Sequence, residues 1–97
     1  MRLAMLQNKY QLALQQLGSL QEQYLAIHKE YNYINAMLGG IVEGSQKVEQ
    51  GKRLAKMKSL DVDIAKCKGR ISALERDIYQ ENMRIARKRA QCYKKRQ

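Results

Sequence analysis

A seven-residue repeat of apolar side chains is the feature that most limits how this chain can fold. In the first segment, apolar residues or tyrosines recur at alternating intervals of three and four, from Leu3 to Ile41. Such a repeat keeps one stripe of a helix facing a partner helix, which is typical of a coiled coil. The expected seam residues are Leu3, Leu6, Tyr10, Ala13, Leu17, Leu20, Tyr24, Ile27, Tyr31, Ile34, Leu38 and Ile41.

The repeat resumes in the second half of the chain. Its expected seam residues are Met57, Leu60, Ile64, Cys67, Ile71, Leu74 and Ile78, and Ile85 and Cys92 fall on the same spacing. The polar residues that interrupt this spacing are Gln50, Arg53, Glu81 and Lys88. At the start, Val48 and Leu54 indicate a shifted phase. We therefore expect an apolar seam that is continuous over 54–78 and weakens beyond it.

A cluster of glycines separates the two repeats. Three of the six glycines, Gly39, Gly40 and Gly44, lie between them, and the sequence contains no proline. Glycine adopts the left-handed conformation that ends helices, and Ser45 is suited to capping the helix that follows. A short glycine-rich link favours two antiparallel neighbouring helices. The first repeat extends to Ile41, so the first helix either ends at Gly39 or runs on to Gly44.

These features predict an all-α fold, an antiparallel two-helix coiled-coil hairpin that forms a single domain over 1–97. The expected elements are a first helix over about 2–40, a turn within about 39–46 and a second helix over about 47–94, at 1.5 Å per residue. Residues after about 87 should overhang the first helix. A two-helix hairpin buries one stripe per helix, so we expect it to form a homodimer or to rest within a larger assembly. A domain-swapped dimer of long helices is a further arrangement that Gly39 and Gly40 permit.

The charge of the chain is strongly basic and uneven. Lys and Arg number 19 against 9 Asp and Glu, for a net charge of +10. The last sixteen residues contain no acidic residue, and their basic residues are Arg84, Arg87, Lys88, Arg89, Lys94, Lys95 and Arg96. A helix C-terminus favours cations, but this number exceeds what the helix dipole requires. The basic end therefore predicts an anionic partner, with an acidic protein surface ahead of nucleic acid and anionic lipid.

The sequence contains no pattern that predicts an enzyme, a cofactor or a metal site. His28 is the only histidine, and Cys67 and Cys92 are 25 residues apart without a histidine nearby. No paired carboxylates stand at catalytic spacing. Both cysteines are expected to be small, buried hydrophobic residues on a helix in a reducing cytosol. No apolar run is long enough for a signal peptide or a membrane span. We expect a cytoplasmic protein.

The run Leu17-Gly18-Ser19-Leu20-Gln21-Glu22-Gln23-Tyr24, followed by Tyr31 and Leu38 and then a glycine-containing turn, resembles the FliJ/YscO family. That family supplies the stalk of the bacterial type III secretion ATPase. The resemblance implies a rod at the cytoplasmic face of a secretion apparatus, which stimulates assembly or turnover of the ATPase ring. It implies that the basic end meets the ATPase subunits and that the tip meets an export gate component or a chaperone. It transfers no catalytic residue.

Two other functions remain open on the sequence. One is an oligomerising coiled coil that acts as a secretion chaperone or scaffold. The other is a basic coiled coil that binds nucleic acid. In leucine-zipper factors the basic region precedes the coiled coil, whereas here it follows it, and no aromatic platform is placed for stacking single strands.

Overall fold

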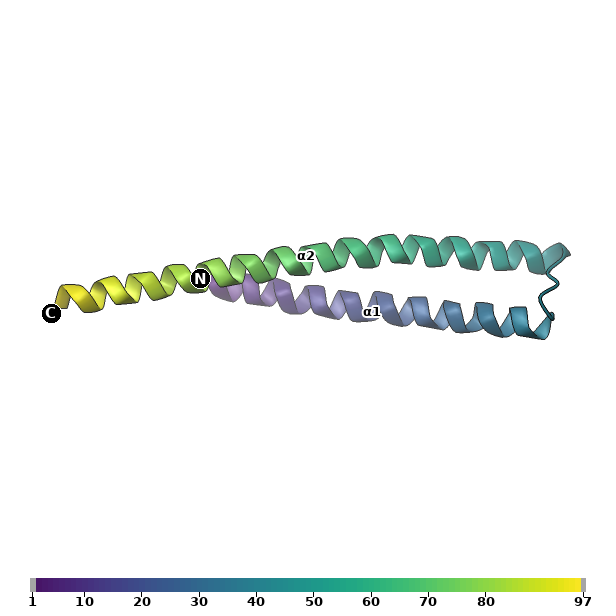
Figure 1. Ribbon diagram of the computed structural model, residues 1–97, viewed down its shortest axis with the longest axis horizontal. Coiled ribbons are helices and arrows are strands. Elements are labelled where there is room, and N and C mark those ends of the chain that lie inside the picture. The colour runs from purple at the N-terminus through teal and green to yellow at the C-terminus, as the bar shows by residue number, and fades with distance from the viewer. Residues whose placement is uncertain (1, 97) are drawn as a thin grey trace.

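The computed structural model describes residues 2–96, with side chains over 2–92, and shows two long helices in an antiparallel hairpin (Figure 1). Helix α1 spans Arg2–Met37 and α2 spans Gly44–Arg96. The prediction of an all-α helical hairpin is confirmed. The molecule measures 80 × 17 × 16 Å. Its length is that of α2 alone, since 53 residues at 1.5 Å each give about 80 Å.

Helix α1 ends three residues before the expected bound of 40, because Gly39 and Gly40 form its C-terminal cap. Gly39, with a φ of 60°, donates its N–H to the carbonyl of Ala36 at 3.2 Å. Gly40 donates its N–H to the carbonyl of Asn35 at 3.1 Å. This pair of bonds is a Schellman motif, which satisfies carbonyls that the end of a helix leaves free. Ile41 consequently lies outside the helix and is 69% exposed, so its assignment to the seam was wrong.

Helix α2 begins at Gly44, three residues earlier than expected. Gly44 has a φ of 61°, a conformation that L side chains rarely adopt. Ser45 lies inside the first turn of α2, so the expectation that it precedes and caps the helix was wrong. The connection between the helices, residues 38–43, is therefore as long as the expected helix bounds allowed but lies three residues closer to the N-terminus, and it contains or adjoins three glycines in the left-handed conformation.

The seam runs along the facing sides of both helices. The most buried apolar residues are Leu6, Ala13, Met57, Leu60, Cys67 and Ile71. The half-buried residues on the same spacing are Leu3, Tyr10, Leu17, Leu20, Tyr24, Ile27, Tyr31, Ile34, Leu38, Ile64, Leu74, Ile78 and Ile85. At the centre, the thiol of Cys67 donates to the carbonyl of Ala13 at 3.3 Å. These two small side chains let the helix backbones approach closely at this point.

The polar residues at the start of α2 lie in the seam, and the expected phase shift does not occur. Gln50 is only 4% exposed and Arg53 is half-buried, whereas Val48 and Leu54 are exposed. Glu81 is likewise 6% exposed. The seven-residue spacing therefore continues unshifted from Gln50 to Ile85, with polar side chains in the layers near both ends.

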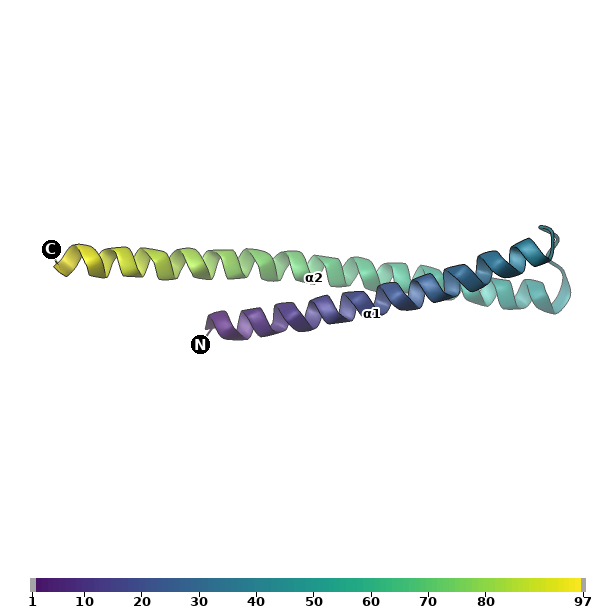
Figure 2. The same cartoon turned by 90° about the horizontal axis from the view of Figure 1, so that it is seen from below.

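The two helices wind about each other along the hairpin. They overlap near the open end in Figure 1 and near the turn in Figure 2, a view turned by 90°. The start of α1, at Arg2 and Leu3, lies beside Glu81, Arg84 and Ile85 of α2. Farther along, α2 extends past the described end of α1 (Figures 1 and 2), close to the expected start of the overhang at about 87. This part of α2 is a single helix without a neighbour among the described residues.

Candidate functional site

A polar network crosses the seam next to the turn. Gln50 donates from Nε2 to the carbonyl of Tyr31 and to Oδ1 of Asn35, both at 3.0 Å. Arg53 donates from Nη1 to Oε1 of Gln50 at 2.9 Å and from Nη2 to Oε1 of Glu30 at 3.1 Å. Because a polar side chain in a coiled-coil seam is satisfied best in one alignment, we expect this network to help set how the two helices pair.

A second polar layer closes the seam at the open end. The side chain of Glu81 is 7% exposed, and its Oε1 accepts a bond of 2.6 Å from Nη2 of Arg84. Nε of Arg2 lies 3.9 Å from Oε2 of the same carboxylate. The hydrogen bond from Arg84 lowers the pKa of Glu81, burial opposes this shift, and the charges of Arg84 and Arg2 add to the lowering. The same bond raises the pKa of Arg84.

The predicted basic end therefore divides into two parts. Arg84 is engaged by Glu81, whereas Arg87, Lys88 and Arg89 are exposed on the helix that extends beyond α1. We refer to these three exposed residues as the basic overhang. The side chains of Lys94, Lys95 and Arg96 lie outside the described residues.

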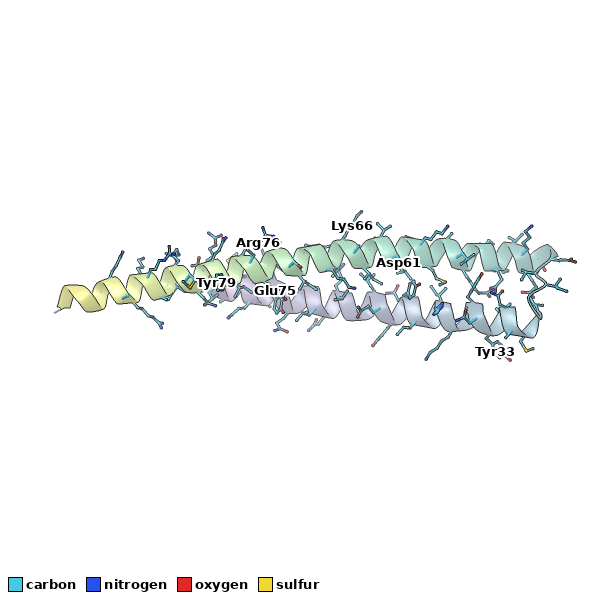
Figure 3. All side chains as sticks on the ribbon, in the orientation of Figure 1. Tyr33, Asp61, Lys66, Glu75, Arg76 and Tyr79 are labelled. Carbon is cyan, nitrogen blue, oxygen red and sulfur yellow. The ribbon has the colours of Figure 1, made fainter. Side chains whose placement is uncertain are left out.

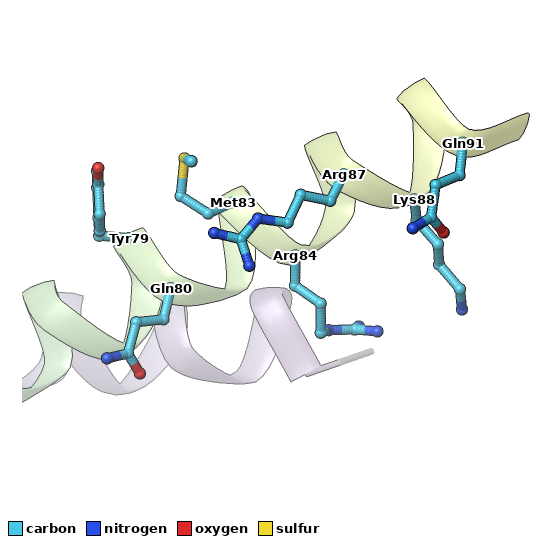
Figure 4. Close-up of a pocket in the computed structure, with 7 residues that line it drawn as sticks. All are labelled: Tyr79, Gln80, Met83, Arg84, Arg87, Lys88 and Gln91. Carbon is cyan, nitrogen blue, oxygen red and sulfur yellow. The ribbon is translucent and has the colours of Figure 1, made fainter. Parts of the chain in front are cut away.

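The basic overhang is continuous with an exposed apolar patch. Tyr79 is 66% exposed and Met83 is 40% exposed. Figure 4 shows Tyr79, Met83 and Arg87 on one side of α2, with the guanidinium of Arg87 folded back toward Met83. Arg84 and Lys88 point to the other side. These residues line a shallow groove on a single helix. An aromatic ring and a thioether beside cations are typical of a protein-contact surface.

An apolar groove also lies between the two helices near the middle of the hairpin. Its apolar lining consists of Leu12 and Ala13 of α1 and Ala73 and Leu74 of α2. Its charged and polar rim consists of Lys9, Gln16, Arg70 and Asp77, and Arg70 donates to Oε1 of Gln16 at 3.3 Å. The groove is open to solvent along its length.

A few other polar or aromatic side chains form isolated pairs. The hydroxyl of Tyr10 donates to Oε1 of Glu75 at 3.1 Å, and this bond raises the pKa of Tyr10, with burial and the negative charge of Glu75 acting in the same direction. His28 stacks on Tyr24 with 5.8 Å between the ring centroids. Within residues 2–92, no three side chains of His, Cys, Asp or Glu come together in a way that could hold a metal ion.

Cys67 is buried in the seam, as expected, whereas Cys92 is exposed on the part of α2 that overhangs α1. The expectation that both cysteines are buried was therefore wrong for Cys92. Neither helix, over its described residues, carries an apolar stretch of the length needed to cross a bilayer.

Sequence reasoning missed Gln50, Arg53 and Glu81 as members of the seam, because their side chains break the apolar pattern. The unbroken seven-residue spacing through these three positions was the available signal.

Comparison of the chain with protein-family models, with curated proteins and with solved structures yields no match. The likeness to the FliJ/YscO family therefore stays a prediction, and the surfaces described above are the basis for proposing a function.

Proposed function

We propose that this protein is a non-enzymatic coiled-coil rod that acts by protein–protein contact and binds an acidic partner surface through its basic overhang. The observation that carries the proposal is the exposure of Arg87, Lys88 and Arg89 on a helix that continues past its partner. No acidic residue follows Glu81 in the sequence, so these charges have no acidic neighbour farther along the helix.

The surface of the rod supports contact with other proteins. The chain exposes 7762 Å², whereas a globular protein of its mass exposes about 5,700 Å². The excess of about 2,000 Å² is comparable with the total area that a stable protein interface buries. Exposed Tyr79 and Met83 next to Arg87 supply the aromatic, methionine and arginine side chains that are enriched in such interfaces.

The specific role that we propose is the stalk or escort of a bacterial type III secretion ATPase, at the cytoplasmic face of the secretion apparatus. Support comes from the resemblance stated above and from the shape, a stiff rod 16–17 Å across with a charged free end. Exposed ion pairs contribute only about 0–1 kcal/mol each. Several weak contacts allow a stalk to engage successive subunits of a ring without being trapped on one.

The test measures ATP hydrolysis and ring assembly of a purified secretion ATPase from the same organism. The wild-type chain should stimulate both, and the triple variant R87E/K88E/R89E should lose most of the stimulation. The matched control is K47E/K56E/K68E, which makes the same change in charge at exposed positions of α2 away from the overhang. If the wild-type chain left both activities of the ATPase unchanged, the stalk role would be refuted.

The two other functions give different outcomes. A scaffold or oligomerising chaperone should scatter light as a stable dimer or larger assembly, whereas a stalk should be a monomer alone. A nucleic-acid binder should retard DNA or RNA with an affinity that falls steeply with salt, and R87E/K88E/R89E should make that salt dependence shallower.

A further inference from the structure

The acidic and the basic residues of α2 lie on different sides of the helix. Its acidic residues lie in the seam or at positions that border the seam in the seven-residue repeat, and they are Glu49, Asp61, Asp63, Glu75, Asp77 and Glu81. Figure 3 shows Asp61 and Glu75 on the side of α2 that faces α1, whereas Lys66 and Arg76 point away from it. The charged residues on the side of α2 that faces away from α1 are all basic.

We define the acid-free face of α2 as the exposed basic residues Lys52, Lys58, Lys66 and Arg76 together with the small and apolar residues between them, Ala55, Val62, Ala65 and Gly69. Its first and last basic residues, Lys52 and Arg76, are 24 positions apart in the sequence, which is about 36 Å along the helix. Lys52 is paired with Glu49, whose Oε1 lies 3.4 Å from its Nζ, whereas Lys58, Lys66 and Arg76 take part in no ion pair with a described residue. These three positive charges, spread over about 27 Å of the helix, attract an anionic partner.

The small residues of this face point to a close approach by another backbone. Gly69 lies in the interior of a helix, where glycine costs about 1 kcal/mol relative to alanine. A Cβ atom added to Gly69 would meet nothing within 4 Å, so no contact inside the hairpin requires glycine there. Gly51, which lies on the same side of α2, is equally unhindered. A partner that packs against the outside of α2 would use the space that these glycines leave open.

The apolar side chains on the same face decide between kinds of anionic partner. Val62 is 53% exposed between Lys58 and Lys66, and Val48 is 59% exposed near the start of the face. A phosphate backbone needs cations but gains nothing from exposed valine, whereas an amphipathic helix buries both kinds of group at once. A second copy of this chain would place lysines against lysines, which is repulsive.

We infer that the acid-free face of α2 binds an acidic amphipathic helix of a partner protein. The apolar side of that helix packs against Val62, Ala65 and Gly69, and its flanking carboxylates meet Lys58, Lys66 and Arg76. This site lies along the body of the hairpin and uses no residue of the basic overhang. Failure of the peptide-binding experiment would therefore not refute the role in ATPase stimulation, and failure of the ATPase experiment would not refute this binding site.

The experiment uses the full chain and a labelled helical peptide of about four heptads, with leucine and alanine on one side and glutamates flanking them. Binding is followed by fluorescence anisotropy at about 50 mM salt and again at about 150 mM salt. The wild-type chain should bind this peptide at least about tenfold more tightly than a scrambled peptide of the same composition. Equal affinity for the two peptides would show plain charge attraction and would overturn the inference.

Two charge-reversal variants with the same net charge locate the site. K58E/K66E/R76E should weaken peptide binding at least about tenfold, and K47E/K56E/K68E should weaken it much less, because lysines that border the seam lie off the proposed site. Equal losses in the two variants would contradict the inference. Tighter binding of a duplex DNA than of the peptide, with selective loss in K58E/K66E/R76E, would assign this face to nucleic acid instead.

A substitution without charge tests the close approach. Gly69→Leu should weaken peptide binding at least about fivefold, because the leucine would occupy the space of the incoming helix. The hairpin itself should melt at the same temperature or higher, since the site is open and leucine favours a helix. Unchanged peptide affinity in this variant would contradict helix packing at Gly69.

Discussion

The middle of the seam and its two ends hold the helices together by different means. In the middle, Leu60 is 2% exposed and Cys67 is fully buried. Near the turn, Gln50 and Arg53 bond across to residues of α1, whereas at the open end Glu81 is held chiefly by Arg84 of its own helix. We therefore expect the apolar middle to contribute most to the free energy of folding, the turn end to set the alignment of the helices, and the open end to contribute least.

The largest effect should come from the apolar middle. Leu60→Ala removes a nearly inaccessible side chain and leaves a cavity, so the free energy of unfolding should fall by about 2–5 kcal/mol. Chemical denaturation followed by circular dichroism measures this loss. Leu12→Ala, at a 58% exposed position of α1, is the control and should change stability by less than about 0.5 kcal/mol. Similar losses in the two variants would show that the seam does not follow the seven-residue repeat.

The polar network at the turn end should have the next largest effect. Gln50→Ala removes the bonds to Tyr31 and Asn35 and leaves Arg53 without an acceptor on its own helix, which should cost about 1–2 kcal/mol. Disulfide trapping of cysteine pairs placed across the seam should also detect pairings other than the native one. If only the native pair formed in the variant, the network would not be what sets the alignment of the helices.

The sequence predicted the hairpin and its apolar layers because both depend on a spacing that is visible without a structure. It could not predict that Gln50 and Glu81 are buried, because that depends on bonds to Tyr31, Asn35 and Arg84, and hydropathy does not record such bonds. The end of α1 was uncertain because a glycine cap is equally compatible with Gly39 and Gly44.

From the sequence, the basic end is predicted as a single cluster, because the sequence does not show which of its cations bonds to another residue of the hairpin. The number of charges does not indicate that Arg84 forms an ion pair within the hairpin. The separation of Arg84 from Arg87, Lys88 and Arg89 required the geometry of Glu81, although the interval of three residues between Glu81 and Arg84 is a favourable one for an ion pair on a helix.

Replacing a glycine by alanine should have opposite effects on stability in the turn and in the body of α2. Gly39→Ala should destabilise the hairpin by about 1–2 kcal/mol, because its φ of 60° is costly for alanine. Gly69→Ala should stabilise it by up to about 1 kcal/mol, because that position is helical and unhindered. Thermal unfolding of the two variants should therefore shift in opposite directions. A stabilising Gly39→Ala would show that α1 continues beyond Met37.

The smallest effect should appear at the open end and should depend on pH. The bond from Arg84 lowers the pKa of Glu81 in the folded chain below its ordinary value of 4.5, so folding favours the ionised carboxylate. Its contribution to stability is present above the ordinary pKa and disappears as the pH falls through the lowered value. Glu81→Gln should therefore melt at a lower temperature than the wild-type chain at pH 7. The difference should shrink in acid, where the wild-type carboxyl is also neutral. A difference independent of pH would mean that Glu81 contributes through packing and not through its charge, and the open end would then resemble the apolar middle more closely than the network at the turn.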